Sequence, residues 1–553
     1  MQALPHAALF RVLERLGVAA ILAAALVPRL RDFNAPLDRE FEGWQGAFFT
    51  IAAINYERLG FARTRGYPVL NVDLGERADA EHRLWDRPEH WFVYTNHPPT
   101  VPLIAWAGLK ALAPEGWNEA WHEARGPQGF EPALRLPFVV VHVAGLVALW
   151  WAAKRAYGAR TALIALALGA ASPPSVLYAT LANYEGPALL CVLLASGCFC
   201  AYLRDGKKRE LALFAACMAA GAAVTWAPLF FLPAFVLHAL LARKPVRAGL
   251  LLAAGGLAGL VPVAVHAVAA GSVQRMLGQP PAGIVARARE LLAPLLDGSA
   301  PIGHWAVLQL ERTLSWCTPG VVIVAAIGLV LAFARARPGA RARQGHGEVR
   351  LAPTLLFGAV LYLLAFYGHT LEPQHTFLLF PALGIVLCAA VALEAASPLL
   401  LRLRAGHAPL VLVTCTLCLL CAVRFNALRY EFRGDLAAKP PAGAVVPRLP
   451  LPPETGAEFG TLVPPGSFSV YPSAVGLNLA PSLYAWRTQL PVSGPQDRKL
   501  AAAPVLGLAH APRFLLLPKE PLSAERASCD ALRALASERV AIESPHWEAW
   551  RLP

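Results

Sequence analysis

The chain has 553 residues, of which 56% are hydrophobic and only 15% are charged, and its mean hydropathy is +0.47. A soluble globular protein carries about a quarter charged residues, so the composition excludes an ordinary soluble enzyme and predicts a membrane protein. The formal net charge of +13 does not indicate a nucleic-acid partner, because the basic residues lie in short loops between apolar segments.

Eleven apolar segments predict transmembrane helices. The run 211–242 is too long for one helix of about 20 residues, and Pro228 and Pro233 in "TWAPLFFLP" predict two helices there. Arg29 and Arg31 stand where a cleavage site would need small residues, so the first segment predicts a retained helix. The expected spans are 12–30, 134–153, 158–180, 185–203, 210–224, 227–242, 247–269, 319–336, 352–369, 377–395 and 408–424.

The basic residues occupy every second loop between these spans. They lie near residues 154–160, 204–209, 243–247, 335–350 and 402–404. The positive-inside rule assigns those loops to the cytoplasm. This alternation predicts a cytoplasmic N-terminus, with the segments 31–133 and 270–318 and the C-terminal region outside.

The first outside segment begins with three carboxylates at alternate positions, Asp38, Glu40 and Glu42, in "PLDREFEGWQGAFF". The following "GWQGAFFTIAAINYERLG" has aromatic and aliphatic residues at helical spacing. The later "NHPPTVPLIAWAGLKALAP" is too short to span a bilayer. Both predict amphipathic helices in the plane of the membrane interface. The simplest interpretation of the carboxylates is a hydrated loop, but the apolar helix that follows would hold them at the membrane surface.

His97 precedes two prolines in "NHPPTVPLIAWAG". Pro98 and Pro99 disfavour helix before them and favour a helix start after them. His97 is therefore predicted at the N-terminal entrance of a helix, where it is either a donor to a bound anion or an incidental turn residue.

Residues 425–553 differ from the rest of the chain. A proline-rich stretch, "KPPAGAVVPRLPLPPETG", is followed by short apolar runs such as "RFLLLP". This pattern predicts a small α/β or β-rich soluble domain. We therefore expect two domains, an all-α polytopic transmembrane domain over 1–424, which includes the outside segment 31–133, and a C-terminal domain over 425–553.

The order of these features resembles the GT-C fold of integral-membrane glycosyltransferases. It is similar in particular to the dolichyl- or polyprenyl-phosphate-mannose protein mannosyltransferase superfamily, which includes the bacterial lipid A aminoarabinose transferases. Members carry an acidic pair before an aromatic helix and then "HPP" or "KPP"; this chain has "REFEGWQGAFFTIAAINYERLGF" and "NHPPTVPLIAWAG". The resemblance covers roughly 1–424.

Three more positions match the family less closely. Glu185 in "LANYEGPALL" stands where the family has an acidic residue opening the fourth span. The hinge "TWAPLFFLP" keeps Thr225 and Pro228 but has Trp226 in place of the family's lysine. The link "LEPQHTFLLFPALGI" offers Gln374 and His375 before a later span.

The resemblance implies an inverting transfer of a sugar from a polyprenyl-phosphate donor to an acceptor hydroxyl of a lipid, glycan or protein. A carboxylate takes the acceptor proton, and donors stabilise the departing phosphate. The family's two acids are adjacent, whereas these three alternate, so the motif does not single out the base. Glu40 and Glu42 are the favoured bases because they are closest to the aromatic helix, and Asp38 is the third candidate. The expected substrate-binding residues are His97, Arg63, Arg65, Glu185, Gln374 and His375.

The implied location is the periplasmic face of a bacterial inner membrane. Glu185 and His375 are compatible with a divalent metal ion, but no cofactor is required by the sequence. Two alternatives remain open: a polytopic transporter or flippase, and a non-catalytic GT-C-like protein that serves an assembly. The predicted spans hold few ionisable residues, which favours an interfacial enzyme over a transporter.

Overall fold

The computed structural model forms two compact units. The first contains residues 1–31, 138–268 and 283–428, and the second contains residues 32–137, 269–282 and 429–553. The structure describes residues 6–31, 33–34, 37, 40–70, 93–115, 117, 129–241, 246–276, 293, 297–298, 301–334, 351–367, 370, 378–402, 408–433, 458–459, 462–463, 468–472, 488–492, 513–519, 523–542, 544 and 546–553.

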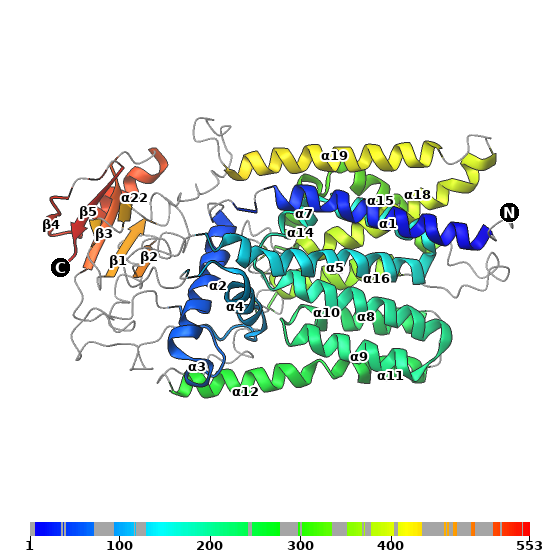
Figure 1. Ribbon diagram of the computed structural model, residues 1–553, viewed down its shortest axis with the longest axis horizontal. Helices are drawn as coiled ribbons and strands as arrows, with labels where there is room; N and C mark the ends of the chain where they lie inside the picture. Colours follow the sequence, from blue (N-terminus) through cyan, green and yellow to red (C-terminus); the bar gives the residue numbers. More distant parts are fainter. Residues whose placement is uncertain are drawn as a thin grey trace. The chain divides into compact units, whose positions relative to one another are not determined.

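The first unit is a helical bundle, and each segment that the sequence predicts as a span is mostly helical (Figure 1). The predicted spans 158–180 and 247–269 are each divided between two helices. The helices are α1 (His6–Leu30), α5 (Glu131–Tyr157), α6 (Ala159–Ala171), α7 (Pro173–Leu177), α8 (Glu185–Asp205), α9 (Lys208–Ala222), α10 (Ala227–Leu241), α11 (Val246–Leu257), α12 (Leu260–Met276), α14 (Ile302–Cys317), α15 (Pro319–Ala334), α16 (Leu351–Ala365), α18 (Leu379–Arg402) and α19 (Ala408–Arg433). The first residues of α5 and the last of α12 belong to the second unit.

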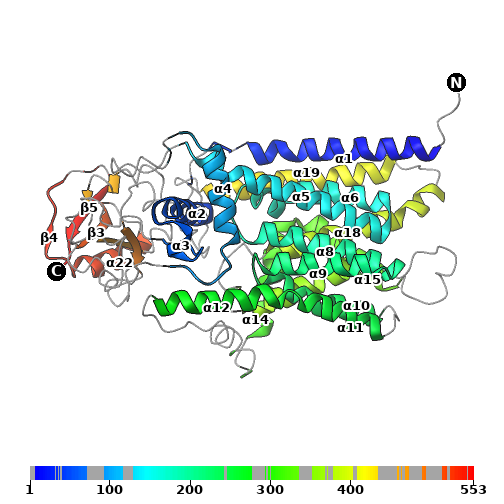
Figure 2. The same cartoon turned by 60° about the horizontal axis from the view of Figure 1, so that its bottom comes forward.

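The bundle is built from neighbouring helices that run side by side (Figure 2). Contacting pairs are α8 with α9, α10 with α16, and α15 with α18. Apolar side chains of α1, α12 and α19 remain exposed, such as Leu16, Val268 and Leu412, which fits helices that face lipid. The protein is therefore a multi-pass membrane protein.

Five helices among the described residues are long and apolar enough to cross a membrane, or six if α14 and α15 together form one broken span. Several further apolar helices are shorter, including α6, α10 and α16. The split of the run 211–242 is confirmed, since α9 ends at Ala222 and α10 begins at Ala227. The exact number of spans stays a prediction.

The chain bends by 115° between α14 and α15. Thr318 at the break has a φ of +63°, a conformation that a β-branched residue rarely adopts. Its hydroxyl contacts Cys421 Sγ at 3.5 Å, and Arg424 of α19 donates to Ser315 Oγ at 2.7 Å. These contacts hold the bend against α19.

The second unit contains α2 (Glu40–Leu59), α3 (Phe61–Thr64), α4 (Thr100–Leu112), the end of α12 and the C-terminal region. The C-terminal region forms a five-stranded sheet of β1 (Phe468–Pro472), β2 (Thr488–Val492), β3 (Arg513–Pro518), β4 (Glu538–Arg539) and β5 (Trp547–Arg551), with α22 (Ser523–Arg533). The order is β2-β1-β3-β5-β4. β1 is parallel to β2 and β3, whereas β5 is antiparallel to β3 and β4.

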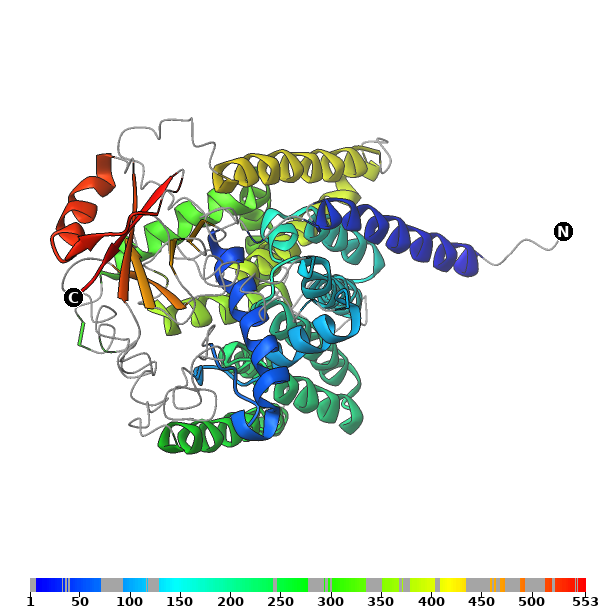
Figure 3. The same cartoon turned by 60° about the vertical axis from the view of Figure 1, so that its left-hand side comes forward.

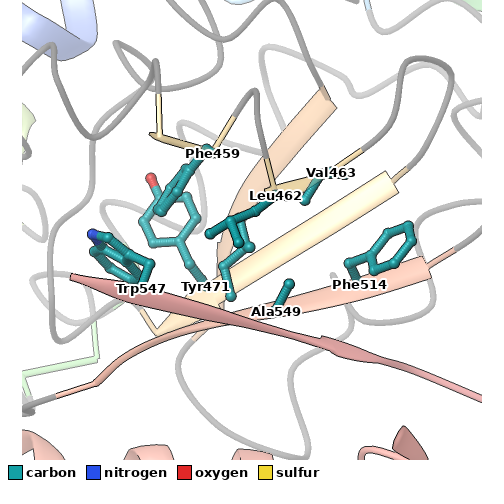
Figure 4. Close-up of a cluster of buried hydrophobic side chains, with 8 residues drawn as sticks. Phe459, Leu462, Val463, Tyr471, Phe514, Trp547 and Ala549 are labelled. Carbon is teal, nitrogen blue, oxygen red and sulfur yellow. The ribbon is translucent and has the colours of Figure 1, made fainter. Parts of the chain in front are cut away.

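One face of this sheet carries an aromatic core. Trp547 packs edge-on against Phe459 with ring centroids 4.6 Å apart, beside Tyr471 (Figure 4). Leu515 of β3 and Cys529 of α22 are also fully buried. The small α/β or β-rich fold expected for the C-terminal region is confirmed by this sheet. A separate domain over 425–553 stays a prediction.

Candidate functional site

The helix α2 begins at Glu40, so Glu40 and Glu42 lie in its first turn. The structure describes the backbone of these two residues and not their side chains, and Asp38 lies outside the described residues. From Gln45 to Tyr56 every residue is buried, so protein covers this part of α2 on all sides. The helix ends before Gly60, whose φ of +77° favours glycine.

The helix α4 starts at Thr100, directly after the two prolines, as the sequence predicts. Its residues Val101, Ala105 and Leu109 recur every fourth position, are fully buried, and form one face. α4 packs on α2. Glu57 of α2 accepts hydrogen bonds from Trp106 Nε1 and from Lys110 Nζ, the latter at 3.2 Å. The segment 31–133, which the sequence predicts to lie outside, therefore contains a packed pair of helices.

His97 is half-buried in the chain that leads into α4. Its ring lies 6.0 Å from the ring of Tyr94, and Tyr94 in turn packs edge-on against Phe48 of α2 at 4.9 Å. The amide of Tyr94 donates to Pro68 O at 3.0 Å. The preceding residue, Val93, forms an antiparallel bridge with Val69. These contacts connect His97 to the helix that begins with Glu40.

The two arginines predicted to bind phosphate lie at the corner after α2. Arg63 is exposed in α3. Arg65 follows α3 with a φ of +52°, and its Nη1 donates to Ser272 Oγ of α12 at 2.6 Å. A Cβ on the adjacent Gly66 would be 3.8 Å from Pro99 Cγ. Arg65 therefore lies close to the His97-Pro98-Pro99 turn. This corner follows α2, the blue helix that Figure 3 shows lengthwise.

Two buried tyrosines support this cluster and remain neutral. Burial raises the pKa of Tyr67 to about 12. Burial also raises the pKa of Tyr56, with a further contribution from Tyr67. Tyr56 donates its hydroxyl proton to Gly66 O at 2.7 Å. Both phenols therefore stay protonated at neutral pH and do not act as bases there.

In the first unit, Glu185 is the first residue of α8. Asn183 Oδ1 accepts a hydrogen bond from the Gly186 amide at 2.8 Å and satisfies one of the free donors at this helix end. Glu185 lies within electrostatic range of the hydroxyls of Tyr178 and Tyr362. Its Oε2 is buried with no hydrogen-bond partner among the residues that the structure describes. An unpaired buried carboxylate oxygen is costly, which marks Glu185 as a functional candidate.

The remaining predicted positions lie near the hinge and the link. Trp226, which replaces the family's lysine, packs edge-on against His266 with ring centroids 6.1 Å apart. Gln374 and His375 lie outside the described residues. Thr370, just before them, accepts a hydrogen bond from Trp305 Nε1 at 2.8 Å. Within the described ranges, no group of three or more His, Cys, Asp or Glu side chains is arranged to hold a metal ion.

The structure brings His97, Arg65 and the backbone start of α2 into one unit, and it locates Glu185 in the other. It also adds residues that the sequence analysis missed, Gln274 and Ser272 at the end of α12. The signal available in the sequence was the polar "SVQR" at the end of an apolar helix. Polar residues of this kind commonly just end a span, so the pattern alone does not indicate a contact with another segment.

A polytopic helical bundle, a helix pair whose first helix begins at Glu40, and a small C-terminal sheet together match the GT-C fold. The family model described as dolichyl-phosphate-mannose-protein mannosyltransferase matches residues 129–268. This match to about a quarter of the chain supports the resemblance that the sequence indicates.

Solved structures match nearly end to end. The apo structure of ArnT from Cupriavidus metallidurans is 15% identical, covers 97% of each chain and gives a TM-score of 0.53. The structure of ArnT bound to undecaprenyl phosphate is 13% identical with a TM-score of 0.54 and the same coverage. The Archaeoglobus fulgidus oligosaccharyltransferase is 12% identical, covers 94% of this chain and 71% of its own, and gives a TM-score of 0.51.

No curated protein sequence matches the chain significantly. The similarities therefore establish the fold, and they support transfer of a lipid-linked sugar as the general class of activity.

Proposed function

We propose that the protein is an inverting glycosyltransferase that moves a sugar from a polyprenyl-phosphate donor to an acceptor hydroxyl at the periplasmic face of a bacterial inner membrane. The observation that carries this proposal is the match over 97% of both chains with ArnT, a protein whose structure is also known bound to undecaprenyl phosphate. The acceptor is a lipid, a glycan or a protein.

The base in this proposal is a carboxylate at the start of α2. A carboxylate that removes the acceptor proton contributes typically 10²–10⁴-fold to a rate. Positions 40 and 42 lie about 200° apart around a helix axis, so one reacting centre is reached from only one of them. The helix start at Glu40 supports a division of labour between Glu40 and Glu42, with Asp38 as the third candidate.

The donor phosphate needs cationic or hydrogen-bonding partners as it departs. His97, Arg63 and Arg65 are the proposed partners, because they gather around the turn that opens α4 and the corner after α2. Gln374 and His375 are proposed to contribute from the link after Thr370. The donor's isoprenoid chain lies against membrane lipid and apolar helix faces.

Glu185 is proposed to bind a sugar or acceptor hydroxyl. Its buried Oε2 has no partner in the described part of the chain, and a ligand hydroxyl that donates to it would satisfy the carboxylate. Glu185→Gln is expected to weaken acceptor or donor use while the fold is kept, because the amide preserves the shape of the side chain.

The test is sugar transfer in cells that lack the protein and are complemented with Asp38→Asn, Glu40→Gln or Glu42→Gln, read by mass spectrometry of the cell-envelope glycans. One of these variants should lose modification by 10²-fold or more. Glu57→Gln is the matched control, because it lies in the same helix and removes the charge that pairs with Lys110 at a partly exposed site. An amide oxygen at this position can still accept the hydrogen bond from Trp106 Nε1. Wild-type modification in all three variants would exclude a base in this segment.

A further inference from the structure

The last two turns of α12 dock onto the outside segment. Ala270 and Val273 pack against Tyr67, Val69 and Val93 in a buried cluster. Residues 269–276 accordingly belong to the same compact unit as α2 and α4. The end of this helix is thus a structural support for the paired segments around Val69 and Val93.

A buried hydrogen bond continues this contact toward His97. Gln274 Nε2 donates to Thr95 Oγ1 at 2.9 Å, although 179 residues separate the two in sequence. The side chains of Gln274 and Thr95 are 7% and 8% exposed. A buried amide and hydroxyl that pair in this way resist displacement, because either group left unpaired costs about 1–3 kcal/mol.

Thr95 lies two residues before His97, and the chain between Thr95 and α4 has little freedom. Pro98 and Pro99 have fixed φ angles, and each proline restricts the residue before it. Tyr94, on the other side of Thr95, is held by Phe48 and by the hydrogen bond of its amide to Pro68 O. A shift of Thr95 is therefore transmitted to His97 and is not absorbed by the turn.

We infer that Gln274 is a positioning residue: through Thr95 it fixes the His97 turn so that the imidazole meets the phosphate of the polyprenyl donor. The inference rests on the proposed function, because it presumes that His97 binds this phosphate. It adds a specific task for the end of α12, which lies just beyond the predicted span 247–269.

The experiment measures binding of undecaprenyl phosphate to the full-length protein in detergent, with undecaprenol as the probe that lacks phosphate. Thr95→Val removes the hydroxyl and keeps the side-chain shape, and Gln274→Met removes the amide and keeps the length. Each should raise the Kd for undecaprenyl phosphate about 5–10-fold and leave binding of undecaprenol unchanged. Thr95→Ser, which retains the hydroxyl, should restore the wild-type Kd.

The matched control is Thr354→Val in α16. Thr354 is 6% exposed and shares a hydrogen bond of 2.6 Å with His238 Nδ1, so the same substitution removes an equally buried hydroxyl elsewhere. It should lower Tm without changing the Kd. A double variant, Thr95→Val with His97→Asn, should bind no more weakly than His97→Asn alone, since both changes act through one contact.

Two outcomes separate the inference from the proposed function. Wild-type affinity in Thr95→Val and Gln274→Met, with weak binding in His97→Asn, would overturn the positioning role and leave the phosphate-binding role of His97 intact. Wild-type affinity in His97→Asn would overturn that role, and the inference would fail with it. Additive losses in the double variant would also contradict a shared contact.

Discussion

Arg29 Nη2 donates a 2.8 Å hydrogen bond to Ser175 Oγ, and both side chains are buried. Arg29 Nη1 also donates to Ala170 O at 3.0 Å, which caps the last turn of α6. Ser175 Oγ also shares a hydrogen bond of 2.8 Å with His142 Nε2 of α5. One arginine thus links α1, α5, α6 and α7.

Arg29→Ala is expected to destabilise the bundle by about 2–4 kcal/mol, because it breaks a buried network and exposes unpaired partners. Arg29→Lys should rescue little of this loss, since a single ammonium group does not reproduce the planar fork. Thermal unfolding in detergent measures the effect. Arg31→Ala is the control, because Arg31 is exposed and its hydrogen bond to Asn426 Oδ1, at 3.2 Å, is exposed as well. Equal Tm values for the two alanine variants would refute the network.

Gly328 of α15 lies directly against the backbone of α18. A Cβ there would overlap the carbonyl oxygen of Cys388. Backbone atoms cannot rotate away as a side chain does, so Gly328→Ala should separate the two helices and cost about 1–3 kcal/mol. Gly145→Ala in α5 is the matched control, since a Cβ there meets no atom within 4 Å. The control should be neutral or slightly stabilising, and an equal loss of Tm in both would argue against the close contact.

Glu458 should make the C-terminal sheet sensitive to acid. Burial disfavours its carboxylate, but hydrogen bonds from the Ser544 hydroxyl and the His546 and Trp547 amides outweigh this and hold the pKa of Glu458 below its usual range. Because this pKa is lower in the folded state, the carboxylate stabilises the fold at pH values above about 4.3, the pKa of an unfolded glutamate. This stabilisation is lost as the pH falls through the folded-state pKa.

Hydrogen exchange of the His546 and Trp547 amides is the measurement for this site, corrected for intrinsic exchange. Protection should fall below about pH 4. In Glu458→Gln it should be low at every pH. Glu538→Gln, at an exposed strand position, should behave as wild type. Acid-independent protection in the wild-type protein would exclude the carboxylate as the acceptor that matters.

Thr370 anchors α14 to the link that leads to Gln374 and His375. Its hydroxyl accepts from Trp305 Nε1 at 2.8 Å, and its carbonyl accepts from Gln309 Nε2 at 2.8 Å. Thr370→Val removes the acceptor of the Trp305 hydrogen bond, and Trp305→Phe removes its donor. Each should lower stability by about 1 kcal/mol, and the double variant should cost less than the sum. Additive changes in Tm would show that the two residues act independently.

The sequence determines much of the architecture through local physics. Helices occur where local patterns predict them. These patterns are the long apolar runs, the prolines at the break near Trp226, and the prolines before Thr100. The carboxylates at the start of α2 could likewise be predicted, because they stand directly before an apolar stretch with helical spacing. The C-terminal sheet could be predicted as a class, because its short apolar runs are bounded by turn residues, but not in its strand order.

The tertiary structure alone decided which distant residues meet. Gln274 and Thr95 pair across 179 residues, and Arg29 reaches Ser175 across 146, contacts that no local pattern encodes. Arg65, expected from the sequence to be available to phosphate, also donates to Ser272. The physical reason is that helix formation and membrane insertion depend on neighbouring residues, whereas buried polar groups find partners only when packing removes water.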